Sequence, residues 1–330
     1  MRFGNRYIVI CLATIIAGLS ITGCSEDIQV IQPGIPIPVV YAVFDLNQTT
    51  HYVKLSKSFA GETDPYTLAA DHDQIFYTEA QVFLSDGYHG NRIPFSLERD
   101  IPRSSGLFPA LPNEAYSLNR KLQEGNNRLT VILPSEKDTL SADFDFIKAF
   151  KVINPKAGFK SFYFYEDPIL FTWVSDPAAG LYEITLNLKF EEWMKNGEFR
   201  VKTASFSRQL NIADLEYEMG RYSYRFYSDS YFAHLGTSIP LDQAVDYRKP
   251  VDLELLITAA DTTLAKYLNW FNLEIDDKVN PNGNVKGAIG VVATKYSISF
   301  PDLILSPRSQ DSLVRGRYTK KLDFISNPDW

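Results

Sequence analysis

The chain has 330 residues, a formal net charge of −7 and two cysteines, Cys11 and Cys24. This acidic balance argues against a nucleic-acid partner, because proteins that bind nucleic acids gather basic residues on one face. Hydrophobic residues make up 45% of the chain, which excludes wholesale disorder, and the 22 Phe and 19 Tyr favour β-structure.

Residues 1–23 have the pattern of a signal peptide. Arg2 and Arg6 precede a mostly apolar run from Tyr7 to Leu19, and small residues follow up to Gly23. The apolar run is shorter than the roughly 20 residues that a membrane-spanning helix needs. We therefore expect this leader to be removed on export.

The sequence Ile21-Thr22-Gly23-Cys24 resembles the bacterial lipobox. That resemblance implies cleavage before Cys24, a thioether to a diacylglycerol, and acylation of the new amino group with a fatty acid such as palmitate. One acyl chain anchors a protein only marginally, whereas several anchor it stably. The alternatives are an ordinary secreted protein with a stray cysteine in its leader, and an uncleaved anchor. With Cys11 lost and Cys24 acylated, the mature chain would have no thiol for a disulfide, a thiolate zinc site or redox chemistry.

Residues 24–37 are expected to form a flexible, proline-rich tether. Glu26 and Asp27 follow the lipidation site directly, and an acidic run at this place resembles the surface-export signal of Bacteroidetes lipoproteins. The resemblance implies an outer-membrane lipoprotein displayed on the cell surface. The periplasmic leaflet is the alternative.

Residues 37–150 contain short apolar or alternating runs separated by turn residues, which is typical of a β-sandwich. The run at 38–44 and the alternating segment at 51–59 should form a hairpin, and 60–73 should form a polar, turn-rich loop. Further strands are expected at 80–84, 93–97, 116–118, 127–133 and 138–144.

Residues 155–326 should form a second β-rich domain after a boundary at Asn154-Pro155. Its clearest strand is 181–190, in which apolar residues alternate, and 199–206 should pair with it. Other strands are expected at 169–173, 222–226 and within 285–299. One amphipathic helix is expected near 261–273, with Asp261 or Thr262 as its cap. The predicted fold is mainly β, a two-domain, Ig-like β-sandwich architecture.

The order of these features resembles the Bacteroidetes lipoproteins of the domain-of-unknown-function family numbered 4249. The lipobox and tether are followed by Val39-Val40-Tyr41-Ala42, Tyr52-Val53-Lys54-Leu55-Ser56 and Glu79-Ala80-Gln81-Val82, and later by Asn280-Pro281 and Gly287-Ala288-Ile289-Gly290. The resemblance covers most of the mature chain. It implies a neighbour of TonB-dependent outer-membrane transporters and supplies no catalytic residues.

Few residues suggest chemistry. Asp71, His72 and Asp73 could offer metal ligands, but the simpler interpretation is a solvated loop. Weak candidates for Ca²⁺ are Asp276, Asp277, Asn280 and Asn282, in an oxygen-rich stretch that runs from Glu274 to Asn284. Pro281 interrupts that stretch, so a helix-exit loop is the simpler interpretation. We expect no cofactor, because the chain has none of the usual phosphate-binding, nucleophile or zinc motifs.

Aromatic clusters lie at 159–165 and 222–232. They could stack on sugar rings, although packing inside the protein explains them more simply. The leading hypothesis is a non-catalytic binding or accessory module at the cell surface, associated with a TonB-dependent transporter. The alternatives are a glycan-acting hydrolase, whose carboxylates would pair in space, and an adhesive or structural envelope protein.

Overall fold

The computed structural model describes residues 36–58, 64–86, 90–101, 113–164, 168–174, 176–271 and 283–330. Within these ranges the chain is mainly β, as predicted, and its strands form three sheets. The largest sheet runs through both halves of the chain. In spatial order its strands are β13 (Phe199–Asn211), β12 (Ala179–Met194), β16 (Val245–Asp261), β17 (Ile289–Leu305), β1 (Pro38–Asp45), β2 (Thr50–Lys57), β6 (Ala115–Asn119) and β5 (Ser96–Glu98). The short β10 (Ser161–Phe162) pairs with β17 beside this path.

The join between the two halves is the parallel pairing of β1 with β17, in which Val40 lies opposite Gly290. Gly290 has a φ of 123°, and a Cβ built on it would lie 1.9 Å from the carbonyl oxygen of Val40. Only glycine fits there, because a side chain would strain the backbone and collide with β1. The glycine in the sequence motif at 287–290 therefore allows the two halves to share a sheet.

A second sheet covers the N-terminal half of the large one and encloses a hydrophobic core. Its strands in spatial order are β4 (Arg92–Pro94), β3 (Gln81–Asp86), β7 (Asn126–Leu133) and β8 (Asp138–Asp145). Val40, Ala42 and Phe44 of β1 pack in this core, and so does Val292 of β17. The predicted hairpin of β1 and β2 is confirmed.

A third sheet covers the C-terminal half and encloses a second core. Its strands are β14 (Glu216–Glu218), β15 (Arg221–Phe226), β11 (Ile169–Val174) and β9 (Val152–Asn154). Tyr182, Ile184, Leu186, Leu188 and Phe190, the alternating residues of β12, all face this core. The predicted pairing of β12 with β13 is confirmed.

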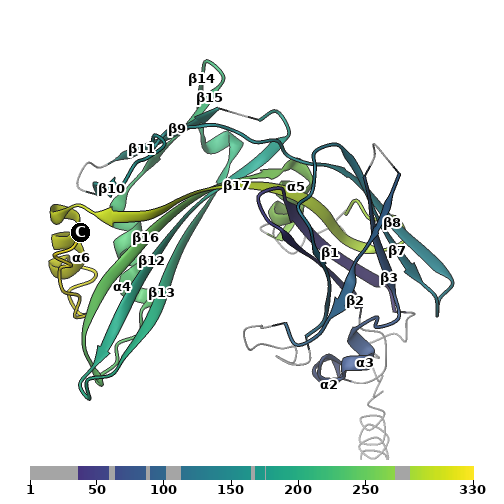
Figure 1. Cartoon of the computed structure of the whole chain (residues 1–330), viewed down its shortest axis with the longest axis horizontal. Helices are drawn as coiled ribbons and strands as arrows, with labels where there is room; N and C mark the ends of the chain where they lie inside the picture. Colours follow the sequence, from purple (N-terminus) through teal and green to yellow (C-terminus); the bar gives the residue numbers. More distant parts are fainter. Residues whose placement is uncertain are drawn as a thin grey trace, which may run out of the picture.

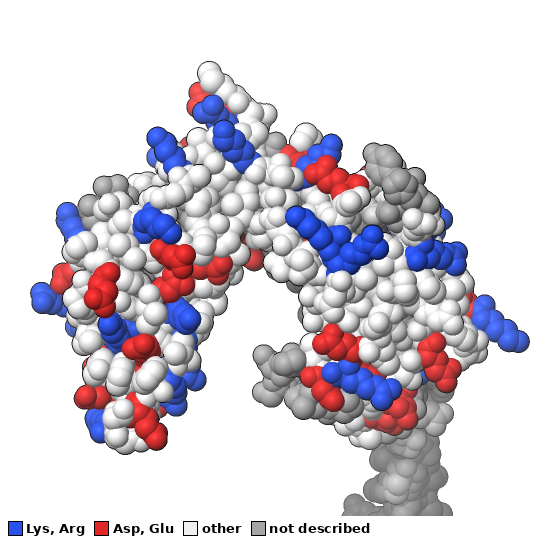
Figure 2. All heavy atoms as spheres, viewed as in Figure 1, with Lys and Arg blue, Asp and Glu red and all other residues white. Residues whose placement is uncertain are grey.

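Both cores lie against the same face of the large sheet. Val292 packs in the first core, Tyr296 packs against both and Ile298 packs against the second, and these alternate positions of β17 point to one side. The opposite face forms the inner side of an arch, with β17 running across its top (Figure 1). Figure 2 shows that inner side as a hollow between two limbs. We call it the concave face.

The predicted helix is confirmed as α5 (Thr262–Phe271), and the Asp261 carboxylate caps it by accepting a hydrogen bond from the Leu264 N–H at 2.7 Å. Residues 272 and 273 lie outside the described ranges. Leu264 and Ala265 pack on the concave face against Ala260 of β16 and Val291 of β17. This contact positions α5 beside the cavity described below.

Other parts of the sequence prediction need correction. The expected loop at 60–73 contains α2 (Pro65–Ala70) and the start of α3 (His72–Ile75), which the side chains of Asp64 and Asp71 cap. The expected strand at 93–97 is split at the buried Phe95, because β4 pairs in the second sheet and β5 in the large one. The elements that the sequence interpretation missed are β9, β10, β14, the whole of β16, a 3₁₀ turn (Ile212–Asp214), α4 (Ser228–Ser238) and α6 (Pro307–Arg315).

The leader, Cys24 and nearly all of the tether lie outside the described residues. The domain limits at 37–150 and 155–326 stay a prediction, and the two cores share strand β17. In the described part of the chain, no helix combines the length and hydropathy that a membrane span requires.

Candidate binding cavity on the concave face

The concave face presents polar side chains in register across the strands of the large sheet. Gln209, Glu183 and Thr258 lie opposite one another on β13, β12 and β16, and Ser297 of β17 follows in the same row. Hydrogen bonds link many of these groups. Thr258 donates to Ser297 at 3.1 Å, and Ser297 donates to Asp45 of β1 at 2.8 Å. The row forms a hydrophilic stripe across the inner surface of the arch.

A cavity of about 450 Å³ lies on this face, where the C-terminal limb meets β1, β2 and α5. Its volume lies within the range of small-molecule sites in proteins. Strands β12, β13, β16 and β17 provide Glu183, Gln209, Thr258 and Lys295, and α5 provides Leu264 and Leu268. Residues from position 41 to position 295 therefore converge on one site.

Two exposed tyrosines form the wall on the β1 and β2 side. Tyr41 and Tyr52 line the cavity, and each is 42% exposed. The ring of Tyr41 lies 6.2 Å from that of Tyr267 on α5, with the planes tilted by 50°. Burial, and then the neighbouring Tyr267, raise the pKa of Tyr41, so its hydroxyl is neutral at physiological pH. This wall offers ring surfaces together with hydroxyl donors.

Asp45 and Lys295 lie opposite each other on β1 and β17, yet they do not form an ion pair. The Asp45 carboxylate is 2% exposed, and it accepts hydrogen bonds from the Asn47 N–H at 2.9 Å and the Ser297 hydroxyl at 2.8 Å. Local groups thus satisfy the carboxylate. Among the described residues, no carboxylate lies within 4.0 Å of the Lys295 ammonium, which is half-buried at the cavity.

Glu183 is the second charge that lines the cavity without a charged partner in the described ranges. The contact found for its carboxylate is a hydrogen bond of 3.3 Å from the Thr185 hydroxyl. Figure 2 shows Asp and Glu side chains, with Lys and Arg side chains among them, on the inner side of the limb that carries β12, β13 and β16. Lys295 and Glu183 are thus two half-buried charges at the cavity that have no ion-pair partner among the described residues.

Lys54 lies at the β2 end of the cavity and is already engaged. Its ammonium donates to the Asn113 side-chain oxygen at 2.5 Å and to the Glu114 carbonyl at 2.7 Å, and it lies 4.1 Å from the centre of the Phe76 ring. These contacts tie β2 to α3 and to the segment before β6. Lys54 therefore contributes to the shape of the cavity more than to its available charge.

The histidines of the described ranges have structural roles. His51 is buried, its Nε2 lies 3.1 Å from the Arg120 carbonyl oxygen, and burial lowers the pKa of its ring. His72 Nε2 lies 3.2 Å from the buried Glu114 carboxylate, which Arg99 also contacts at 3.0 Å. Asp71 caps α3. His234 contacts the Ser205 carbonyl oxygen at 2.8 Å.

No metal site emerges in the part of the chain that the structure describes, because no three His, Cys, Asp or Glu side chains there could hold one ion together. Cys24 and the calcium candidates Asp276, Asp277, Asn280 and Asn282 all lie outside that part. Asn284, at the end of the same stretch, lies inside it. Both polar atoms of its side chain bond the backbone of Val292, at 2.7 and 2.9 Å, so Asn284 fixes the start of β17.

Most described residues of the aromatic clusters are packing residues, although Tyr163 and Tyr227 are 40% and 56% exposed. Phe162, Phe164, Phe226, Tyr231 and Phe232 are all at most 5% exposed and belong to the second core.

The sequence analysis did not identify the residues of the cavity, although one usable signal was present. The outward-facing positions of the alternating strand at 181–190 include Glu183. No local pattern indicates that β1 and β17 pair with each other and bring their residues to the same cavity.

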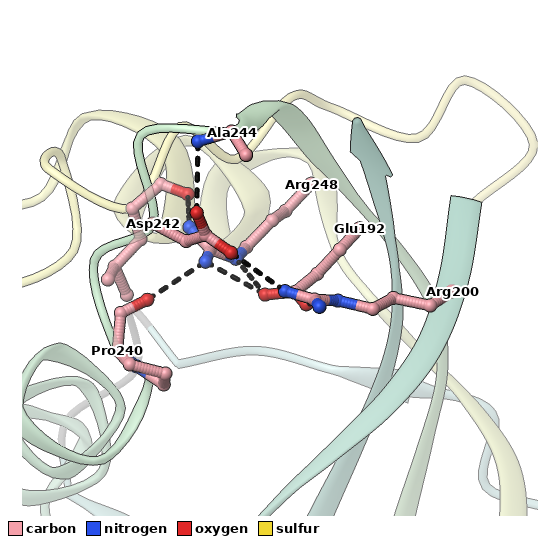
Figure 3. A network of polar contacts seen from close by, with 7 residues as sticks. Glu192, Arg200, Pro240, Asp242, Ala244 and Arg248 are labelled. Atoms are coloured by element: carbon pink, nitrogen blue, oxygen red, sulfur yellow. Dashed lines mark hydrogen bonds and ion pairs between the residues drawn. The ribbon is translucent and has the colours of Figure 1, made fainter. Parts of the chain in front are cut away.

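A separate polar network fixes the far end of the same limb (Figure 3). Arg248 is 1% exposed and donates to Glu192 at 2.9 Å, to the Leu322 carbonyl at 2.7 Å and to the Pro240 carbonyl at 3.0 Å. Arg200 donates to the other oxygen of Glu192 at 2.7 Å and to Asp242 at 2.9 Å. The network joins β12, β13 and β16 to the C-terminal segment and is structural.

Comparisons with known proteins identify neither a family nor a function for the chain. No protein-family model matches the chain, and no curated protein matches it. Among solved structures, it is similar over 68% of its length to the C-terminal globular domain of an oligosaccharyltransferase from Pyrococcus abyssi, with 11% identity and a TM-score of 0.22. It is similar over 80% of its length to the BSP domain of a biofilm-associated protein, with 11% identity and a TM-score of 0.14. The chain spans 48% and 58% of those two chains. Similarities this low carry no argument about fold or function.

Proposed function

We propose that the protein is a non-catalytic binding module whose ligand occupies the cavity on the concave face. The observation that carries the proposal is the convergence of aromatic, apolar and charged groups from six strands and α5 on one cavity of about 450 Å³. A ligand there would contact both halves of the chain. Because β1 and β17 join those halves side by side, the cavity is already formed without a ligand.

The proposal places the module at the outer membrane, held by an acylated Cys24 and displayed at the cell surface, where it would serve a TonB-dependent transporter. The support for this part is the sequence pattern around Cys24 and the resemblance to family 4249. Protease treatment of intact cells should degrade the wild-type protein. The control is a strain that has first been shown to retain the protein in the periplasm, where the protease should spare it. The Cys24→Ala variant should lose membrane attachment, and a membrane-bound variant would contradict lipidation. A pulldown that recovers no outer-membrane transporter would argue against the partner.

The ligand site is tested by filling the cavity. Gln209 is exposed on β13 and lines the cavity, so Gln209→Trp should block it with little effect on folding. Thr203→Trp places the same side chain on the same face of β13, outside the cavity, and is the matched control. Native mass spectrometry against a panel of oligosaccharides, amino acids and short peptides should find a ligand for wild type and Thr203→Trp that Gln209→Trp does not bind. A panel that yields no such ligand would contradict the proposal.

A further inference from the structure

The two uncompensated charges in the cavity indicate which chemical class the ligand belongs to. Lys295 and Glu183 both line the cavity, both are half-buried, and neither has an oppositely charged partner among the described residues. Partly buried charges are stabilised by a partner of opposite sign. Asp45 is not that partner for Lys295 in this structure: the two form no ion pair, and the Asp45 oxygens accept hydrogen bonds from Asn47 and Ser297 instead.

The spacing of the two residues on the sheet sets a scale for the ligand. Lys295 lies opposite Ala260, which lies opposite Leu181, and Glu183 is two residues further along β12. Two strand spacings across the sheet and two residues along it place the two Cα atoms about 12 Å apart. An extended peptide spans roughly 3.3–3.6 Å per residue, so two to four residues match this distance.

The surface between the charges is partly apolar. Thr258 and the buried Ala260, both on β16, lie between them on the sheet, and Leu264 and Leu268 of α5 line the same cavity. The Tyr41 ring borders it from β1. A ligand that fits this arrangement carries a positive end, a negative end and an apolar side chain between them.

Resting on the proposed function, we infer that the cavity binds short peptides of two to four residues with free termini. The ammonium end of the peptide contacts Glu183, its carboxylate contacts Lys295, and an apolar side chain packs between α5 and Tyr41. An oligosaccharide would use the tyrosine rings, yet it would leave both charges without partners. Peptide termini satisfy both of them.

The test measures binding of a tripeptide mixture to the full chain in mild detergent, by equilibrium dialysis with mass spectrometric readout. We expect retention of tripeptides with free ends, and at least tenfold weaker binding after N-acetylation or C-amidation. Glu183→Gln should lose the preference for a free amino end, and Lys295→Gln the preference for a free carboxyl end. Glu124→Gln and Lys189→Gln, exposed sites outside the cavity, should bind like wild type. Circular dichroism verifies that each variant is folded.

Three outcomes would overturn the inference: no retained peptide, equal binding of capped and free peptides, or unchanged binding by both cavity variants. A parallel dialysis with neutral oligosaccharides distinguishes failure of this inference from failure of the proposed function. If an oligosaccharide binds, Gln209→Trp abolishes that binding and the two charge variants leave it unchanged, the cavity is a ligand site but not a peptide site. If neither class binds to wild type, both proposals fail.

Discussion

Replacing Arg248 with Met tests whether the network at the end of the C-terminal limb holds the C-terminal segment in place. The substitution keeps most of the side-chain volume and removes three donated hydrogen bonds, to Glu192, Leu322 and Pro240. Breaking a buried ion pair by removing one partner costs about 3–5 kcal/mol, because the other charge stays buried. Arg200 still contacts Glu192 at 2.7 Å, so we expect a loss near the lower end, about 3 kcal/mol.

The pH dependence of the effect gives a second readout. Burial by itself would raise the pKa of Glu192, but the hydrogen bonds and charges of Arg200 and Arg248 outweigh it and lower that pKa. A carboxyl whose pKa is lowered by folding stabilises the protein above its unfolded pKa, and this stability is lost as the pH falls through the folded pKa. The gap in unfolding free energy between wild type and Arg248→Met should therefore narrow below about pH 4.5.

The assay is urea unfolding followed by tryptophan fluorescence, at pH 7 and at steps down to about pH 3. Arg248→Met with Glu192→Leu removes both buried charges, so the double variant should lose less than the sum of the two single losses. Arg128→Met, which breaks an exposed pair with Asp143, is the control and should be close to wild type. A loss below about 1 kcal/mol for Arg248→Met, or a gap that stays constant with pH, would refute the reasoning.

Three further perturbations probe the join between the halves and its surroundings. Gly290→Ala should lower the free energy of unfolding by about 1–3 kcal/mol or prevent folding, because its Cβ would lie 1.9 Å from the Val40 carbonyl oxygen. An unchanged melting temperature would contradict this prediction. Asp261→Ala leaves the N–H groups of Leu264 and Thr294 without their acceptor, and urea unfolding should show a loss of roughly 2–4 kcal/mol. Burial lowers the pKa of His51 from 6.5, so folding keeps the ring neutral and wild type should lose stability as the pH falls below about 6.5. Melting curves of His51→Gln should lack that slope, and a variant with the same slope would rule out His51 as its source.

Local sequence patterns were sufficient for the strands whose two faces differ sharply. Tyr182, Ile184, Leu186 and Leu188 alternate with polar residues, and they form a strand with one buried face, as predicted. The same signal was present but overlooked in β16, where Leu253, Leu255 and Ile257 alternate in the same way. The Asp261 cap and the apolar spacing after it likewise predicted α5. These features depend on neighbouring residues, which a sequence displays directly.

The candidate site depends on pairings between distant residues. Glu183 and Lys295 are 112 positions apart in the sequence (295 − 183), and they share a cavity because β16 lies between β12 and β17 and because β1 closes the other side. The outward positions of single strands could be listed from the sequence as polar, without any indication of which strands are adjacent.

The sequence by itself determined that the chain is mainly β, that a helix begins at Asp261 or Thr262, and that the residues around Cys24 resemble a lipidation site. It determined these because periodicity and caps are local properties of a few residues. Only the tertiary structure decided that β1 pairs in parallel with β17 and that one sheet serves both cores. The physical reason is that strand pairing is set by packing between distant segments, here by the close approach of Gly290 to Val40, and no local pattern encodes which segments meet.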